Sequence, residues 1–181
     1  MPGSTPPFRA DQVGSLLRPQ ALKEARARHA SGEIDADALR AVEDDEIRKV
    51  IAKQEAIGLK AVTDGEFRRA FWHLDFLERI GGVEAYEGEQ QPMFKGIQHK
   101  PVMLRTVGKV APTLDHPMIE HFRFVKDNAH VTPKMTIPSP TSLHFRYGRA
   151  SIDTGVYPDL DAFFADLGQA YAAMVPALSL I

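Results

Sequence analysis

The stretch "LKAVTDGEFRR", residues 59–69, indicates the fold class, because a short apolar run ends abruptly in a cluster of acidic and basic side chains around a glycine. The apolar part is of the buried type, which predicts a strand inside a sheet. Directly before it, apolar residues at helical spacing predict a helix from an N-cap at Asp35 to a C-cap glycine at Gly58. A helix that leads straight into a buried strand is typical of α/β proteins with a parallel sheet.

Further helices are predicted on both sides of this stretch. Pro19 suits the first position of a helix that ends near Ala30. Asp115 and the proline after it indicate a helix that ends near residue 125. A strongly patterned last helix begins at Leu160, and Pro176 is expected to interrupt it.

Core strands are predicted near Val13, Val62 and Ile137. A closed (β/α)8 barrel needs eight strands and roughly 250 residues, so the pattern alone leaves a barrel and an open sheet as alternatives. The expected organisation is one domain over residues 1–181, with a flexible, proline-rich lead-in at 1–10 and a hairpin or excursion at 81–112.

Composition removes several classes of partner. The 181 residues carry 22 basic and 24 acidic side chains, so no strong field would attract a nucleic acid or an anionic membrane. No apolar run reaches about 18 residues and no signal peptide is recognisable, which makes the cytoplasm the expected location. The sequence contains no cysteine, so it offers no disulfide, no thiol nucleophile and no thiolate metal ligand.

Polar residues follow each predicted strand, in "VGS" (13–15), "TDGE" (63–66) and "IPSPT" (137–141). In parallel α/β folds, substrates bind at these carboxyl ends of strands. The amides of Gly14 and Ser15, expected to lead into a helix, could hold a carboxylate, while Glu66 could hold an ammonium group or transfer a proton. Together these residues suit an amino-acid substrate.

Each of these features also has a purely structural interpretation. Gly-Ser before a helix and "DGE" after a strand are common turns. Arg68 and Arg69 are expected to be solvated or paired with nearby carboxylates such as Glu66. Phe71, Trp72 and Phe76 are more often core residues than stacking platforms for a planar ring, and the seven histidines form no metal-binding pair.

Three co-linear motifs resemble a known family. They are "FRADQVGSLLRP" (8–19), "KQEAIGLKAVTDGEFRRAFWHLDF" (53–76) and "HFRFVKDNAHVTPKMTIPSPTSLHF" (121–145). In order and spacing they resemble the cobalamin-independent methionine synthases, above all the short bacterial members that correspond to the catalytic C-terminal barrel. The resemblance runs from about residue 8 to residue 172.

The resemblance implies a TIM-type barrel in which zinc binds the thiol of homocysteine, and the resulting thiolate attacks the methyl group of a methyl-folate. It implies that the amino-acid end of homocysteine is bound by Val13, Gly14, Ser15 and Glu66. Further candidates for the pocket are Asp64, Trp72, Ser139 and Thr141.

The family's zinc ligands are a histidine, a glutamate and two cysteines, and all of them come later in the barrel than the matched motifs. We therefore expect this chain to be the N-terminal half of a barrel, without catalytic or metal-binding residues of its own and inactive without the missing C-terminal half. Three alternatives stay open. They are a non-catalytic half-barrel that binds a partner, a relative that transfers a thiol to an epoxide, and a metal-free barrel like uroporphyrinogen decarboxylase, to which only Arg18 points.

Overall fold

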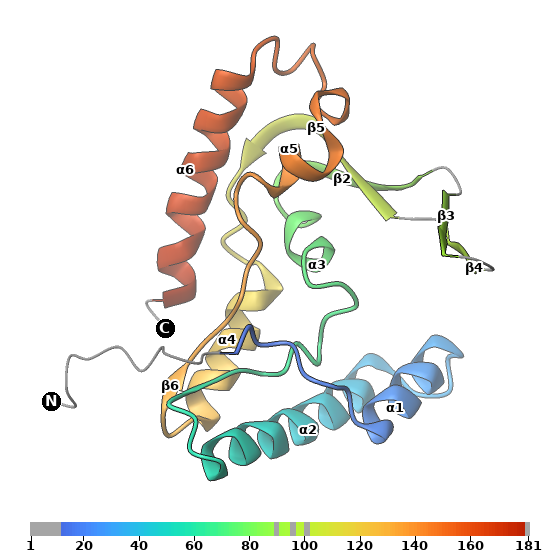
Figure 1. The fold of residues 1–181 in the computed structure, drawn as a ribbon, viewed down its shortest axis with the longest axis vertical. Helices are drawn as coiled ribbons and strands as arrows, with labels where there is room; N and C mark the ends of the chain where they lie inside the picture. The colour runs from blue at the N-terminus through green and yellow to red at the C-terminus, as the bar shows by residue number, and fades with distance from the viewer. Residues whose placement is uncertain (1–11, 89–90, 95–96, 100–101, 180–181) are drawn as a thin grey trace, which may run out of the picture. The chain divides into compact units, whose positions relative to one another are not determined.

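The computed structural model describes residues 12–88, 91–94, 97–99 and 102–179 (Figure 1). The predicted lead-in at 1–10 lies outside the described residues. By its internal contacts the chain divides into two compact units. Unit 1 comprises the residues up to Arg69 together with Glu120–Thr136, and unit 2 comprises Ala70–Ile119 and the residues from Ile137 onward.

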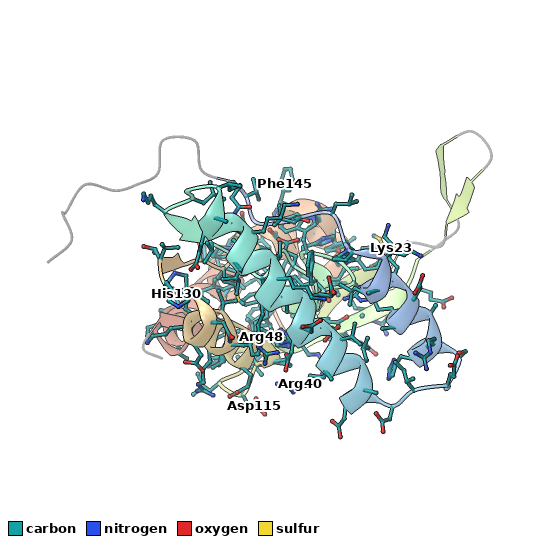
Figure 2. The ribbon with its side chains drawn as sticks, turned by 90° about the horizontal axis from the view of Figure 1, so that it is seen from below. Lys23, Arg40, Arg48, Asp115, His130 and Phe145 are labelled. Carbon is teal, nitrogen blue, oxygen red and sulfur yellow. The ribbon has the colours of Figure 1, made fainter. Side chains whose placement is uncertain are left out.

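Unit 1 contains the two helices that local signals predict, α1 (Gln20–Ala30) and α2 (Ala36–Ala56). Pro19 stands at the N-cap of α1, and Asp35 caps α2 by accepting the amide of Ala38 at 2.8 Å. Gly58 follows the end of α2 with φ +88°, the left-handed conformation that glycine adopts most easily. Figure 2 shows charged side chains along both helices, including the exposed Lys23 and Arg40.

A short parallel sheet forms the centre of unit 1. Strand β1 (Ala61–Val62) pairs with β6 (Thr132–Pro133), which follows α4 (Pro117–Asn128), a helix that lies in unit 1 from Glu120 onward. The parallel pairing confirms the strand predicted at "LKAV" and the α/β class. The core under this sheet consists of Leu22, Ile47, Ile51, Val62, Phe67 and Val125.

Two of the predicted core strands are wrong in their position. Residues near Val13 form no strand, because the Val13 carbonyl accepts a hydrogen bond from the hydroxyl of Thr136 instead of joining a backbone ladder. The strand expected near Ile137 lies earlier in the chain, as β6 at Thr132–Pro133, and Pro138 and Pro140 have no N–H with which a later ladder could form. Among the described residues, only β1 and β6 pair in parallel within named strands, and no closed barrel forms.

Unit 2 is built on an antiparallel pair within the segment for which a hairpin or excursion was expected. Strand β2 (Gly81–Glu87) pairs with β5 (Val102–Ala111), and the smaller pair β3 (Gln91–Phe94) and β4 (Ile97–His99) lies between them in sequence. The helices of unit 2 are α3 (Leu74–Leu77), α5 (Ser142–Tyr147), a 3-10 turn at Arg149–Ser151 and α6 (Leu160–Ser179). The first residues of α4, up to Ile119, also belong to this unit.

The aromatic residues expected in the core differ in their burial. Phe76, in α3, is fully buried, as predicted. Phe71 and Trp72, which precede α3, are 45% and 41% exposed, so the expectation of core residues is wrong for them. The backbone of this segment is held by Asp75, whose carboxylate accepts the amides of Ala70 at 2.7 Å and of Phe71 at 3.0 Å.

Helix α6 buries the predicted apolar stripe, which includes Phe163, Leu167 and Met174. The expected interruption at Pro176 is wrong, since the helix continues through it to Ser179. Proline keeps a helical φ, and so close to the end of the helix its missing N–H removes one hydrogen bond without stopping the last turn.

Candidate functional site

The turn after β1 is held in an unusual conformation by its own side chains. The hydroxyl of Thr63 accepts the amide of Gly65 at 3.1 Å, and the Asp64 carboxylate accepts the amide of Glu66 at 2.9 Å. Glu66 has φ +59°. Among the described residues it is the only one, apart from glycines, with a positive φ. Such a conformation costs a side-chain-bearing residue about 1–2 kcal/mol, so the hydrogen bonds of this turn stabilise a strained position.

The same turn is bound directly to the "VGS" segment. Thr63 donates its hydroxyl proton to the Gly14 carbonyl at 2.8 Å, and the amide of Leu16 donates to the Gly65 carbonyl at 3.0 Å. Gly14 has φ +127°, and a Cβ there would lie 3.3 Å from the side chain of Thr63. The close approach of the two segments therefore favours glycine at this position.

Two backbone amides beside the turn have no acceptor among the described residues. They are the amides of Gly14 and Ser15, whereas that of Leu16 is used. They do not lead into a helix as expected, because α1 begins only at Gln20. Of the three residues in "VGS", Gly14 is buried, while Ser15 is exposed and Val13 is 75% exposed.

Glu66 is a buried acid with one cationic partner. Its side chain is 7% exposed, and one carboxylate oxygen lies 3.5 Å from Nη1 of Arg69, whose side chain is 2% exposed. Among the described residues no other group is within hydrogen-bonding distance of this carboxylate. Because 3.5 Å is longer than a strong charge-assisted hydrogen bond, the carboxylate keeps capacity for a second donor.

Two arginines that the sequence did not single out for this role fix the turn from the side. Arg18 donates to the carbonyl of Arg69 at 2.6 Å and to that of Glu66 at 3.3 Å. Arg26 donates to the Arg69 carbonyl at 3.1 Å and to the Phe67 carbonyl. These contacts span more than 40 positions of sequence, so no local pattern could reveal them.

Arg68 has a structural role, but not with the partners expected. It pairs with Glu43 at 3.2 Å and with Asp44, both on α2, and its guanidinium lies 5.1 Å from the ring centroid of Phe124. Its side chain is only 4% exposed, so the expectation of a solvated or locally paired arginine is wrong for Arg68. For Arg69 the pairing with Glu66 is confirmed.

The remaining site candidates are divided between the units. Asp64 is buried in unit 1 as the cap of the turn. Trp72, Ser139 and Thr141 belong to unit 2, where the hydroxyls of Ser139 and Thr141 lie 2.9 Å apart. Nearby, the Tyr171 hydroxyl donates to the Pro138 carbonyl at 3.0 Å, and burial raises the pKa of Tyr171.

An open apolar groove of about 540 Å³ lies along the "IPSPT" segment of unit 2. It is lined by Ile137–Pro140 on one side and by the C-terminal half of α6 on the other, including Val175, which is 45% exposed. The groove offers a site for apolar atoms and has little polar chemistry of its own.

The donor atoms of this chain do not fit a zinc-thiolate centre. The sequence has no cysteine, and the described residues include no group of three or more side chains that could hold a metal ion. Helices long and apolar enough to cross a membrane are also absent from the described part of the structure.

Comparison with known proteins gives a consistent set of relatives. The Bacillus subtilis protein YxjG, which is uncharacterised, is 45% identical over 174 residues, covering 95% of this chain and 45% of YxjG. A methionine synthase of Sulfurisphaera tokodaii is 30% identical over 132 residues, which are 72% of this chain and 38% of the relative. No family model matches the chain.

A solved structure from Listeria monocytogenes, provisionally assigned as a vitamin-B12-independent methionine synthase, superimposes with a TM-score of 0.80 at 39% identity. The match covers 98% of this chain and 50% of the Listeria protein. The chain thus spans about half the length of the relatives that it matches.

Proposed function

Since this chain belongs to the cobalamin-independent methionine synthase family, we propose that it binds the amino-acid end of homocysteine for methyl transfer. One observation carries the proposal. The "VGS" segment and the turn that ends in Glu66 are joined by the Thr63–Gly14 and Leu16–Gly65 hydrogen bonds, so amides without an acceptor among the described residues and a buried carboxylate lie on two segments that are bonded to each other.

In this proposal the two ends of the amino acid meet opposite charges. The amides of Gly14 and Ser15 donate to the substrate carboxylate, which replaces the acceptor that they otherwise lack. The Glu66 carboxylate accepts from the substrate ammonium through the capacity that Arg69 leaves. The turn conformation orients Glu66 before the substrate arrives, so little ordering is needed on binding.

We further propose that the chain is the first part of a (β/α)8 barrel and that the rest of the barrel completes the reaction. The zinc ligands and most contacts to a methyl-folate donor would then lie on polypeptide outside this sequence. The absence of cysteine and the coverage of about half of each relative support this division. The 181-residue chain by itself is then expected to bind substrate without methylating it.

Calorimetric titration of L-homocysteine into the chain tests the substrate proposal. Glu66→Gln removes the charge that faces the ammonium, and the loss of a charge-assisted hydrogen bond should weaken binding about 10-fold to 100-fold. Glu66→Asp keeps the charge but shortens its reach, so it should bind with intermediate affinity and keep the turn folded.

Glu33→Gln is the matched control, because Glu33 is an exposed acid outside the turn, paired with Arg28. It should leave the affinity unchanged. Equal affinities for the wild type and both Glu66 variants, or no measurable binding by the folded wild type, would remove the proposal.

A non-catalytic chain that binds a partner, and a transferase that moves a thiol to an epoxide, remain the alternatives. The homocysteine titration separates them from the main proposal, because only the main proposal predicts binding of L-homocysteine that depends on Glu66. Stoichiometric zinc or turnover by this chain alone would contradict the division of the site proposed here, while a folded chain that fails to bind homocysteine would favour a purely structural partner.

A further inference from the structure

The side chain of Gln54, on α2, pairs with the backbone of the residue that begins the turn after β1. Its Nε2 donates to the Thr63 carbonyl at 2.8 Å, and its Oε1 accepts the Thr63 amide at 3.1 Å. A primary amide offers the same donor and acceptor as a peptide group, so Gln54 takes the place that a neighbouring strand would have beside Thr63. Both residues are buried, and the pairing is therefore shielded from water.

Two further contacts complete the hydrogen bonding of this amide. Nε2 of Gln54 also donates to the Val50 carbonyl at 3.0 Å, and Oε1 also accepts from Nε2 of Gln12. The side chain thus makes four hydrogen bonds, two donated and two accepted, which is the full capacity of a glutamine. A carboxylate in its place would keep the acceptors but set a negative charge against two carbonyl oxygens.

Thr63 transmits this restraint to both segments of the proposed amino-acid site. Its hydroxyl donates to the Gly14 carbonyl at 2.8 Å and accepts the amide of Gly65 at 3.1 Å. Every polar group of Thr63 is therefore engaged, the backbone by Gln54 and the hydroxyl by the two segments. Gln12, which is bonded to Gln54, is two positions before Gly14, so α2 holds the "VGS" side directly as well as through Thr63.

We propose that Gln54 is a positioning residue for the amino-acid site and acts through Thr63. This inference rests on the proposed function, because the groups that Gln54 positions are the amides of Gly14 and Ser15 and the carboxylate of Glu66. A buried amide with its full set of hydrogen bonds sets the spacing between the two segments, and binding both ends of one small molecule requires a fixed spacing.

Gln54→Met tests the proposal, because methionine has a similar length and is unbranched but lacks the N–H donors and the carbonyl oxygen. In hydrogen exchange followed by NMR, the amides of Thr63 and Gly65 should exchange about tenfold faster relative to those of Thr132 and Lys134, which belong to the β1–β6 pairing. The affinity for L-homocysteine, measured by titration calorimetry, should fall about tenfold.

Ile51→Val is the matched control. Ile51 is also buried on α2, three positions before Gln54, but packs in the apolar core. Loss of one buried methyl group destabilises the unit as a whole. The variant should therefore speed the exchange of the turn amides and of the β1–β6 amides by the same factor, and it should leave the homocysteine affinity unchanged.

Two results with a folded Gln54→Met chain would overturn the proposal. One is faster exchange at Thr63 and Gly65 that the β1–β6 amides match, and the other is an unchanged affinity for homocysteine. If this variant does not fold, the wild type decides, because its Thr63 amide should exchange as slowly as that of Lys134, and exchange at the rate of an exposed amide would contradict the pairing. A wild type that fails to bind homocysteine would refute the proposed function, while the exchange rates would still decide whether Gln54 positions the turn.

Discussion

Glu66 combines two costs that proteins normally avoid, a left-handed backbone and a buried charge. The strained backbone is held by hydrogen bonds from the Glu66 amide to Asp64 and from Arg18 to the Glu66 carbonyl. The buried charge is offset by Arg69. Strained residues of this kind occur often at functional sites. From sequence, Glu66 could be selected by its place after a strand and by the family resemblance. The dihedral angle and the buried arginine could not be predicted, because both depend on contacts made by the folded chain.

The effects of replacing Glu66 and Arg69 on the free energy of unfolding should be strongly coupled. Glu66→Gln removes the carboxylate that faces the buried Arg69 guanidinium at 3.5 Å, and breaking one side of a buried pair costs about 3–5 kcal/mol of unfolding free energy. Urea denaturation followed by circular dichroism measures this cost. The double variant Glu66→Gln with Arg69→Met should be less destabilised than the sum of the two single variants, and simple additivity would contradict a direct interaction.

His73 should titrate below the ordinary histidine pKa of 6.5, because burial and Arg146 both disfavour its charged form. The unfolded chain then binds a proton more readily than the folded one. The contribution of His73 to stability should therefore be complete above about pH 6.5 and decline as the pH falls through its lowered pKa. Proton NMR titration measures this, with His73→Gln identifying the signal, and a midpoint above 6.5 would contradict the buried environment.

Helix ends were predicted correctly where the sequence signal lies within a few residues of the helix that it caps. The caps at Asp35 and Gly58 gave the ends of α2, because each acts on its own helix. The strand expected near Val13 failed, since its pairing depends on Thr63 and Thr136, far along the chain. The end of α6 failed because Pro176 breaks a helix only where the lost hydrogen bond and the ring clash are costly.

The cap of α2 gives a direct test at this scale. Asp35→Ala removes the side chain that accepts the Ala38 amide at 2.8 Å, which should destabilise the chain by about 1 kcal/mol. Asp37→Ala is the control, because Asp37 is also an exposed acid in the first turn but caps nothing. Thermal unfolding compares the two variants, and an equal effect would show that charge near the helix end matters instead of the cap.

For the whole molecule, the proposed substrate framework lies on a chain without cysteine, and its described residues include no group of three or more side chains that could hold a metal ion. Family resemblance selected the "VGS" segment and Glu66 from sequence, and the hydrogen bonds of Thr63 and Leu16 explain how the fold joins them. The contributions of Arg18 and Arg26 were missed, because arginines that bind backbone carbonyls 41 or more residues away leave no pattern in the sequence. The chain matches about half of YxjG and of the Listeria protein, and we propose that the remaining functions belong to the part of such proteins that it does not match.

The most direct test of the proposed amino-acid site is amide chemical-shift mapping of the isotope-labelled chain with L-methionine and with its analogue that lacks the amino group. We expect saturable shifts at the amides of Gly14, Ser15 and Glu66 with L-methionine, and a selective loss of the Glu66 shift with the analogue. Shifts that avoid both segments, or that are identical for the two compounds, would contradict an amino-acid site between these amides and Glu66.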